Sequence, residues 1–158
     1  MKLRIWRFTA VLLTALSMGL SIAHLFEMPV RLQLAPELWV RITVIEGIFR
    51  YFGSVGAVIE LGSVVSAAVL AILTWKRRRT VSLLATAGAI CITLALLNWF
   101  IFVASANVEL ARWLTGPVAA DFEGWRRQWE FGHAASAILK LIGFALLTAS
   151  VVWDRSDP

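Results

Sequence analysis

Four long apolar stretches alternate with short polar connections along the chain. Each stretch reaches roughly the 20 residues that a helix needs to cross a bilayer. The interiors of two stretches contain no charged residue, and the other two contain one each, Glu60 and Lys140. This pattern predicts an all-α, integral membrane four-helix bundle in which residues 1–158 form a single transmembrane domain. The predicted spans are residues 8–28, 51–75, 80–106 and 130–153, with approximate bounds.

The composition agrees with a membrane protein. Hydrophobic residues make up 59% of the chain and charged residues 16%, and the mean hydropathy is +0.78, whereas soluble domains contain about 25% charged residues. These values exclude a disordered chain and argue against a water-soluble globule. The single cysteine, Cys91, excludes an intramolecular disulfide and a thiolate-rich metal site.

The basic residues predict the orientation of the spans. One group of them collects at one end of the spans, namely Lys2, Arg4, Arg7, Lys76, Arg77, Arg78, Arg79 and Arg155. Because short loops rich in Lys and Arg remain on the cytoplasmic side, we expect an N-in, C-in protein of the bacterial inner membrane. The net charge of +5 is then a topology signal, and no nucleic-acid partner is expected, because such binding needs a larger basic face.

The first span has a second interpretation as a cleaved signal peptide. A basic segment precedes it, and Ser21-Ile22-Ala23 resembles a cleavage site. The uncharged run is longer than the hydrophobic part of a typical signal peptide, so we interpret the span as a retained helix.

The two outer connections are expected to be partly structured. In the first, Leu38, Ile42, Ile45 and Phe49 recur at helical spacing, which predicts a helix with an apolar face along these residues. The alternation of residues 39–44 also permits a short strand. In the second, a helix is expected to begin before the fourth span and to continue into it.

Polar side chains form one seam on each span. Ionisable groups at membrane depth are costly and face the bundle interior, so helical phase and depth predict their neighbours. The seams consist of Ser17, Ser21, His24 and Arg31; of Glu46, Arg50, Gly53 and Glu60; of Cys91, Asn98 and Ser105; and of Arg126, Glu130, His133, Ala137 and Lys140. From the rise of about 1.5 Å per residue, two tiers are expected: an outer one of His24, Glu27, Glu130 and His133, and a deeper one of Glu60, Asn98 and Lys140.

The outer tier contains a candidate metal site. It combines His-x-x-Glu on the first span with Glu-x-x-His on the fourth, a spacing that puts carboxylate and imidazole on one helix face. Di-iron carboxylate bundles also need a Glu from each of the other two helices, so that set is incomplete here. The sequence leaves open a single metal ion bound by His24, Glu27, Glu130 and His133, a haem between the two histidines, or no cofactor. In the metal-free alternative the acids pair with Arg50, Arg126 or Arg127.

Glu60 and Lys140 are expected to face each other in the deeper tier. A structural ion pair that fixes helix register and a proton-transfer pair are both compatible with the sequence. Small residues on the same helices are expected to allow close packing, among them Gly53, Gly56, Gly62, Gly132 and Gly143.

Three short motifs resemble those of a known family. They are A-H-L-x-E-x-P at residues 23–29, G-x-x-G-A-x-x-E at residues 53–60, and W-R-x-x-W-E-x-G-H-A at residues 125–134. Together they resemble small bacterial four-span membrane proteins grouped with the anthrone oxygenases, most of which have no established activity. The resemblance covers nearly the whole chain and implies a four-helix membrane protein that oxidises a hydrophobic aromatic substrate with O₂.

The leading functional hypothesis is an oxygenase-like protein that acts on a small lipophilic molecule of phenol, anthrone or quinone type in an outer polar pocket. The base that abstracts a proton is expected among His24, Glu60, Glu130 and His133. The substrate or its anion is expected to contact Arg50, Asn98, Arg126, Trp129 and Lys140. The alternatives are a non-enzymatic accessory subunit of a larger membrane complex and a haem- or metal-binding electron carrier. Expected partners are the lipid bilayer, a lipophilic ligand, and a homo-oligomer or larger complex.

Overall fold

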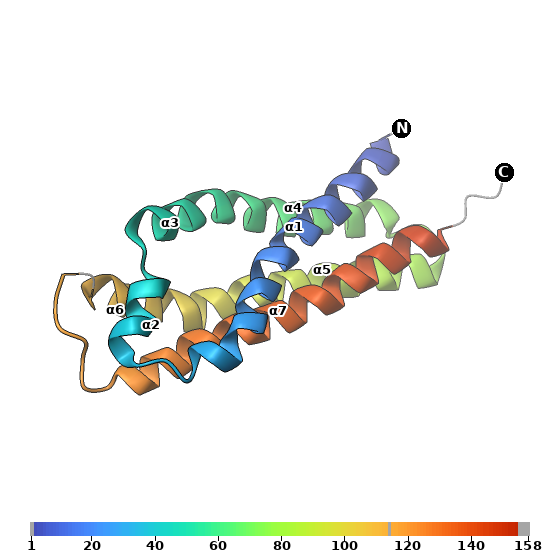
Figure 1. Cartoon of the computed structure of the whole chain (residues 1–158). Helices are drawn as coiled ribbons and strands as arrows, with labels where there is room; N and C mark the ends of the chain where they lie inside the picture. The colour runs from blue at the N-terminus through green and yellow to red at the C-terminus, as the bar shows by residue number, and fades with distance from the viewer. Residues whose placement is uncertain (1, 114, 155–158) are drawn as a thin grey trace.

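The computed structural model describes residues 2–113 and 115–154, and within these residues the regular structure is entirely helical (Figure 1). The helices are α1 Lys2–Arg31, α2 Pro36–Thr43, α3 Glu46–Tyr51, the π-helical turn η1 Phe52–Gly56, α4 Ala57–Thr74, α5 Arg79–Asn98, the π-helical turn η2 Trp99–Val103, α6 Ala104–Trp113 and α7 Phe122–Trp153. The expected four-helix membrane bundle is confirmed, whereas the alternative of a strand at residues 39–44 is wrong, because α2 covers most of this segment.

Four helical segments of the described residues are long and apolar enough to cross a membrane. They are Lys2–Arg31, Phe52–Thr74, Arg79–Trp113 and Phe122–Trp153. The second and third continue through η1 and η2 without a break in the helical rod. Several of these segments extend beyond the spans expected from hydropathy, because their polar ends remain helical after the apolar run stops.

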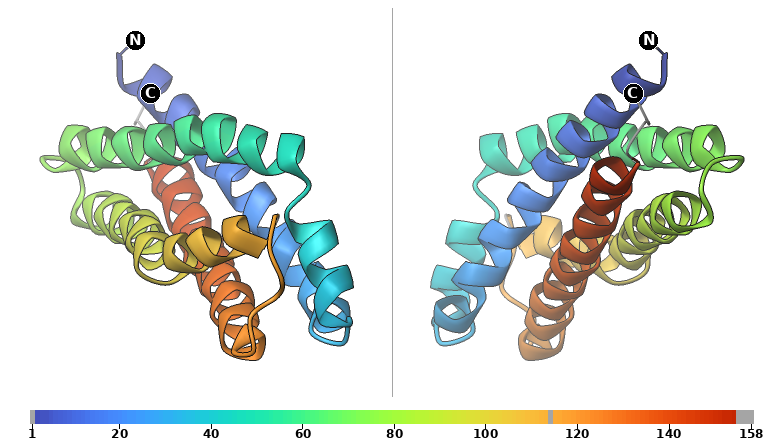
Figure 2. Two further views of the ribbon diagram at one scale, coloured as in Figure 1. Left: turned by 90° about the vertical axis from the view of Figure 1, so that its left-hand side faces the viewer. Right: turned by 90° about the vertical axis from the view of Figure 1, so that its right-hand side faces the viewer.

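The four segments close into a ring of neighbours. α1 packs against α4 and α7, and α5 packs against the same two helices (Figures 1 and 2). Arg7 and Arg77 both form ion pairs with Asp154, so the start of α1, the end of α7 and the α4–α5 link lie at one end of the bundle. We call this the proximal end, and the opposite end, where α1 ends and α7 begins, the distal end.

Glycines allow close contact at α5–α7. A Cβ atom at Gly143 would lie 2.6 Å from Ile92 Cδ1, and one at Gly88 would lie 2.8 Å from Leu147 Cγ. Gly132 lies equally close to Val103, and a Cβ at Gly62 would be 3.1 Å from a methyl carbon of Leu13. The packing role expected of Gly62, Gly132 and Gly143 is therefore confirmed.

The expected packing role of Gly53 and Gly56 is wrong. An added Cβ at either residue meets no atom within 4 Å, and Tyr51, Phe52 and Val58 are exposed. The reason is that α4 and α5 diverge from their link toward the distal end, so that α3 and η1 stand away from α7 (Figures 1 and 2). In the distal part of the second span, residues 51–55 are all exposed.

The first connection packs with a different face from the expected one. Trp39, Val40 and Val44 are buried, whereas Leu38 and Ile42 are exposed. The buried side chains join α6 and α7 in one apolar cluster, which also contains Val103, Ala106, Leu110, Trp113, Phe122 and Trp129. Ile45 is exposed as well, and the side chains of Glu46 and Phe49 lie outside the described part of the structure.

A pair of valine substitutions tests this difference between the glycines. Gly143→Val forces a branched side chain against Ile92 and the backbone of Gly88, and overpacking of this kind costs about 1–3 kcal/mol. Gly53→Val enters open space and should leave stability nearly unchanged. The measurement is the apparent melting temperature of both variants in the same detergent. Equal losses would show that the two glycines are packed alike.

Candidate functional site

Two histidine rings meet near the distal end of the bundle. The ring centroids of His24 on α1 and His133 on α7 are 4.4 Å apart, with an interplanar angle of 39°. The indole of Trp129 lies 4.2 Å from the His133 ring and 5.2 Å from the His24 ring, measured between centroids. The proximity of His24 and His133 expected from phase and depth is confirmed. The two imidazoles and the indole form one aromatic cluster.

One imidazole nitrogen in this cluster has no hydrogen-bond partner within the described residues. Nδ1 of His24 is buried and makes no such bond. A buried polar nitrogen without a partner costs roughly 1–3 kcal/mol, and such exceptions are often explained by a functional group or an ordered water. The His24 nitrogen is therefore available to a small polar group that enters the cluster.

Glu130 holds the surrounding helices together. Its side chain is fully buried on α7, and Oε1 accepts hydrogen bonds from Nε of Arg31 at 2.8 Å and from Nε1 of Trp39 at 2.7 Å. The Arg31 guanidinium also donates to Thr43 Oγ1 at 2.5 Å and lies 4.9 Å from the Trp129 ring centroid. The second carboxylate oxygen, Oε2, has no hydrogen-bond partner among the described residues. One carboxylate thus connects α1, α2 and α7 next to the histidine pair.

The proposed metal ligands do not converge. Glu27 is exposed and forms an ion pair with Arg31 at 3.7 Å. Within residues 2–113 and 115–154, no three His, Cys, Asp or Glu side chains are grouped to hold a metal ion. A haem between His24 and His133 does not fit this arrangement, because bonds of about 2 Å from each nitrogen to the metal require the rings to stand farther apart than 4.4 Å.

The deeper tier is a polar network around Lys140. Nζ of Lys140 donates to Ser21 Oγ at 2.8 Å and forms an ion pair with Oε1 of Glu60. Ser17 Oγ donates to the same Glu60 oxygen at 2.9 Å. The expected contact between Glu60 and Lys140 is confirmed, and it joins α1, α4 and α7 in the middle of the bundle.

Two of the residues expected to bind substrate have structural partners instead. Asn98 Nδ2 donates to the carbonyl of Gly132 at 2.7 Å and to Ser136 Oγ at 2.9 Å, so it fastens α5 to α7. Arg126 donates to the Leu34 carbonyl at 2.7 Å and pairs with Glu123, so it holds the connection after α1.

Lys140 of that set belongs to the deeper network, and the last two members, Trp129 and Arg50, lie in different environments: one is buried and one is exposed. Trp129 lies in the aromatic cluster, and its Nε1 donates to Asn107 Oδ1 at 2.9 Å. Arg50 is exposed on α3, which stands apart from α7 (Figures 1 and 2). The arginine that reaches Glu130 is Arg31, not one of the arginines expected from the sequence.

Arg31 and Trp39 are the site residues that the sequence reasoning missed as partners of Glu130. Arg31 was recognisable as a member of the α1 seam, seven residues after His24. Trp39 carried no such signal, because the apolar periodicity of its segment favoured another face of the helix.

Comparison with known proteins finds no relative. No protein-family model, no curated protein and no solved structure matches the chain. These comparisons therefore assign no function to the chain.

A double-mutant cycle tests the ion pair of the deeper tier. Glu60→Gln and Lys140→Met should each destabilise the protein by several kcal/mol, because each strands a buried charge. The double variant should recover part of the loss, with a coupling energy of about 0.5–3 kcal/mol. The measurement is the free energy of unfolding in detergent or bicelles.

The exposed pair Glu109–Arg112 supplies the matched control. Its coupling should be about 0.2–1 kcal/mol or less, as for other surface ion pairs. Strictly additive losses at Glu60 and Lys140 would contradict the buried pair.

Proposed function

We propose that the protein is an oxygenase-like membrane protein whose His24–His133 pair removes a proton from a small lipophilic aromatic molecule of phenol, anthrone or quinone type. The observation that carries this proposal is a buried imidazole nitrogen without a partner, in an aromatic cluster beside an arginine. The resemblance of the three motifs to the anthrone-oxygenase group supports the same reaction class, because all three include residues of the two polar tiers.

His24 is the base in this proposal. Its unpartnered nitrogen accepts the proton, and a positioned imidazole typically contributes 10²- to 10⁴-fold to such a step. His133 and Trp129 pack against the His24 ring and hold this imidazole in position. The guanidinium of Arg31, 4.9 Å from the Trp129 centroid, stabilises the negative charge that develops on the substrate.

The oxidant is O₂, and the reaction balances without another electron donor. Loss of a proton from a ring CH₂ leaves a delocalised carbanion, which transfers its electrons to O₂ and forms a C–O bond. The resulting hydroperoxide loses water, using the proton held by His24, and becomes a ketone. One CH₂ group and one O₂ thus give one C=O group and one H₂O.

The orientation belongs to the same proposal. With the basic link 76–79 and both termini in the cytoplasm of a bacterium, the distal end with the histidine pair faces the outer side of the inner membrane. A lipophilic substrate would then reach the cluster from the outer leaflet. Lys140 lies deeper in the bundle, where it contacts Glu60 and Ser21, and it has no direct part in the proposed step.

An accessory subunit of a larger membrane complex is the second candidate. It is favoured by the distal part of the second span, where Tyr51, Phe52, Val55 and Val58 are all exposed. A partner helix could pack there, with the polar tiers serving only stability.

Oxygen uptake by purified protein in lipid nanodiscs tests the proposed activity. With 1,8-dihydroxyanthrone as the probe, the native chain should consume O₂ and form the anthraquinone faster than empty nanodiscs. His24→Ala should lower this rate by about 10²-fold or more, because the base is lost. Product is measured by its absorbance and O₂ with an electrode.

Phe131→Ala is the matched control, since Phe131 lies on α7 two residues before His133 and is exposed. It should retain the native rate. The oxygenase proposal would be contradicted if the native chain consumed no O₂ with the anthrone, or if folded His24→Ala protein consumed it at the native rate. Either result would favour the accessory role.

A further inference from the structure

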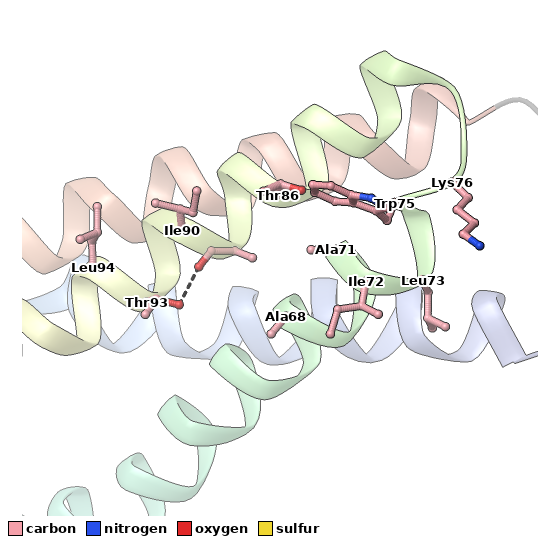
Figure 3. Close-up of a pocket in the computed structure, with 11 residues that line it drawn as sticks. Ala68, Ala71, Ile72, Leu73, Trp75, Lys76, Thr86, Ile90, Thr93 and Leu94 are labelled. Carbon is pink, nitrogen blue, oxygen red and sulfur yellow. Dashed lines mark hydrogen bonds between the residues drawn. The ribbon is translucent and has the colours of Figure 1, made fainter.

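The proximal end carries a second feature, a groove between α4 and α5 that none of the polar tiers enters. It has a volume of about 760 Å³ and is lined mainly by apolar side chains. Ala68, Ala71 and Ala89 line the groove with small side chains that leave the space between the helices open. Ile72 and Ile90 border it (Figure 3). Ile72 is 73% exposed and Ile90 53% exposed, so the groove opens toward the hydrocarbon that surrounds a spanning helix pair.

A smaller, more polar pocket adjoins the apolar groove. The two share Trp75 and Thr86 in their walls, and the second pocket is also lined by Arg77, Arg79 and Ser82. Figure 3 shows Trp75 beside Thr86 at the end of the apolar groove, with Lys76 at the same end. Because Trp prefers the level of the lipid headgroups, this end of the groove lies at the membrane interface.

We call the end of the groove next to Trp75, with residues 76–79, the basic mouth. Its positive charge is poorly balanced by carboxylates of the protein. Lys76, Arg78 and Arg79 are exposed, and within residues 2–113 and 115–154 none of them has an ion-pair partner. Arg77 alone reaches a described carboxylate, that of Asp154, at 3.3 Å and shared with Arg7. The mouth therefore offers cationic groups to an anion from outside the chain.

The start of α5 adds to the same field. This helix of 20 residues begins at Arg79 with no side-chain cap and no acidic residue in its first turn. Free amide groups and the helix dipole make such an end favourable for a phosphate group.

We propose that this groove binds an anionic phospholipid, with one acyl chain between α4 and α5 and the headgroup phosphate at Lys76 and Arg79. The apolar groove and the basic mouth are continuous, and together they match the two ends of such a lipid. A cluster of Lys and Arg next to a span favours anionic lipids by a factor of about five for each basic residue. The site is separate from the histidine pair and does not depend on the proposed oxygenase activity.

Native mass spectrometry of the full chain in detergent tests the proposal with phosphatidylglycerol and phosphatidylcholine of identical acyl chains. The native chain should retain one phosphatidylglycerol with at least about tenfold higher affinity than phosphatidylcholine. Lys76→Gln/Arg79→Gln should remove most of this preference. Ala68→Leu, which fills the apolar groove, should lower the retention of both lipids.

Two control variants distinguish lipid binding in the groove from general electrostatic attraction of anionic lipid to the basic end of the bundle. Lys2→Gln/Arg4→Gln removes the same charge at the same end of the bundle, and Ala57→Leu adds the same side chain to an exposed position of α4 outside the groove. Both should leave lipid binding unchanged. Equal affinity of the native chain for the two lipids, an equal loss in Lys2→Gln/Arg4→Gln, or equally tight binding of glycerol phosphate without acyl chains would overturn the proposal.

Discussion

A charged side chain in a bundle surrounded by lipid needs an ion-pair partner within the same bundle. Glu130 is the most deeply buried charged residue of the described chain. Its carboxylate is fully buried and depends on Arg31 and Trp39 for its hydrogen bonds. Removing one partner of a buried ion pair costs about 3–5 kcal/mol. The ion pair therefore determines how α1 and α2 meet the start of α7.

The position of the histidine pair follows from this contact. Arg31 lies about two helical turns after His24 on α1, and His133 lies one turn after Glu130 on α7. In the structure Arg31 pairs with Glu130 while His24 and His133 face each other across the same two antiparallel helices. The Lys140–Glu60 pair holds the same register deeper in the bundle and adds α4 to it. Structural ion pairs thus position the residues to which we assign chemistry.

Much of this arrangement could be predicted from the sequence. Long apolar runs identify spanning helices, because a segment within the bilayer must satisfy its backbone N–H and C=O groups internally, as an α-helix does. The histidine contact and the Glu60–Lys140 pair followed from two independent constraints, helical phase and depth along antiparallel helices. Both constraints act within rigid rods whose rise per residue is known.

The contacts outside the rods could not be predicted in the same way. The face of α2 that is buried depends on its packing against α6 and α7. Trp39 therefore lies in the core, although the apolar periodicity of its segment favoured burial of Leu38 and Ile42. The partner of Glu130 is Arg31, which belongs to the predicted seam of α1 but was not among the arginines expected to pair with this carboxylate. Gly53 and Gly56 resemble the packed glycines in spacing, and only the divergence of α4 from α5 leaves them exposed.

His24 and His133 are the only two histidines of the chain, and the proposed function depends on their contact. Solid-state NMR of protein with ¹³C,¹⁵N-labelled histidine in lipid bilayers tests this contact most directly, because every ring signal arises from His24 or His133. Dilution with unlabelled protein removes contacts between molecules. A cross-peak between the two rings is expected, because their centroids lie 4.4 Å apart. Strong signals within each ring without any cross-peak between them would contradict the histidine pair and the function proposed for it.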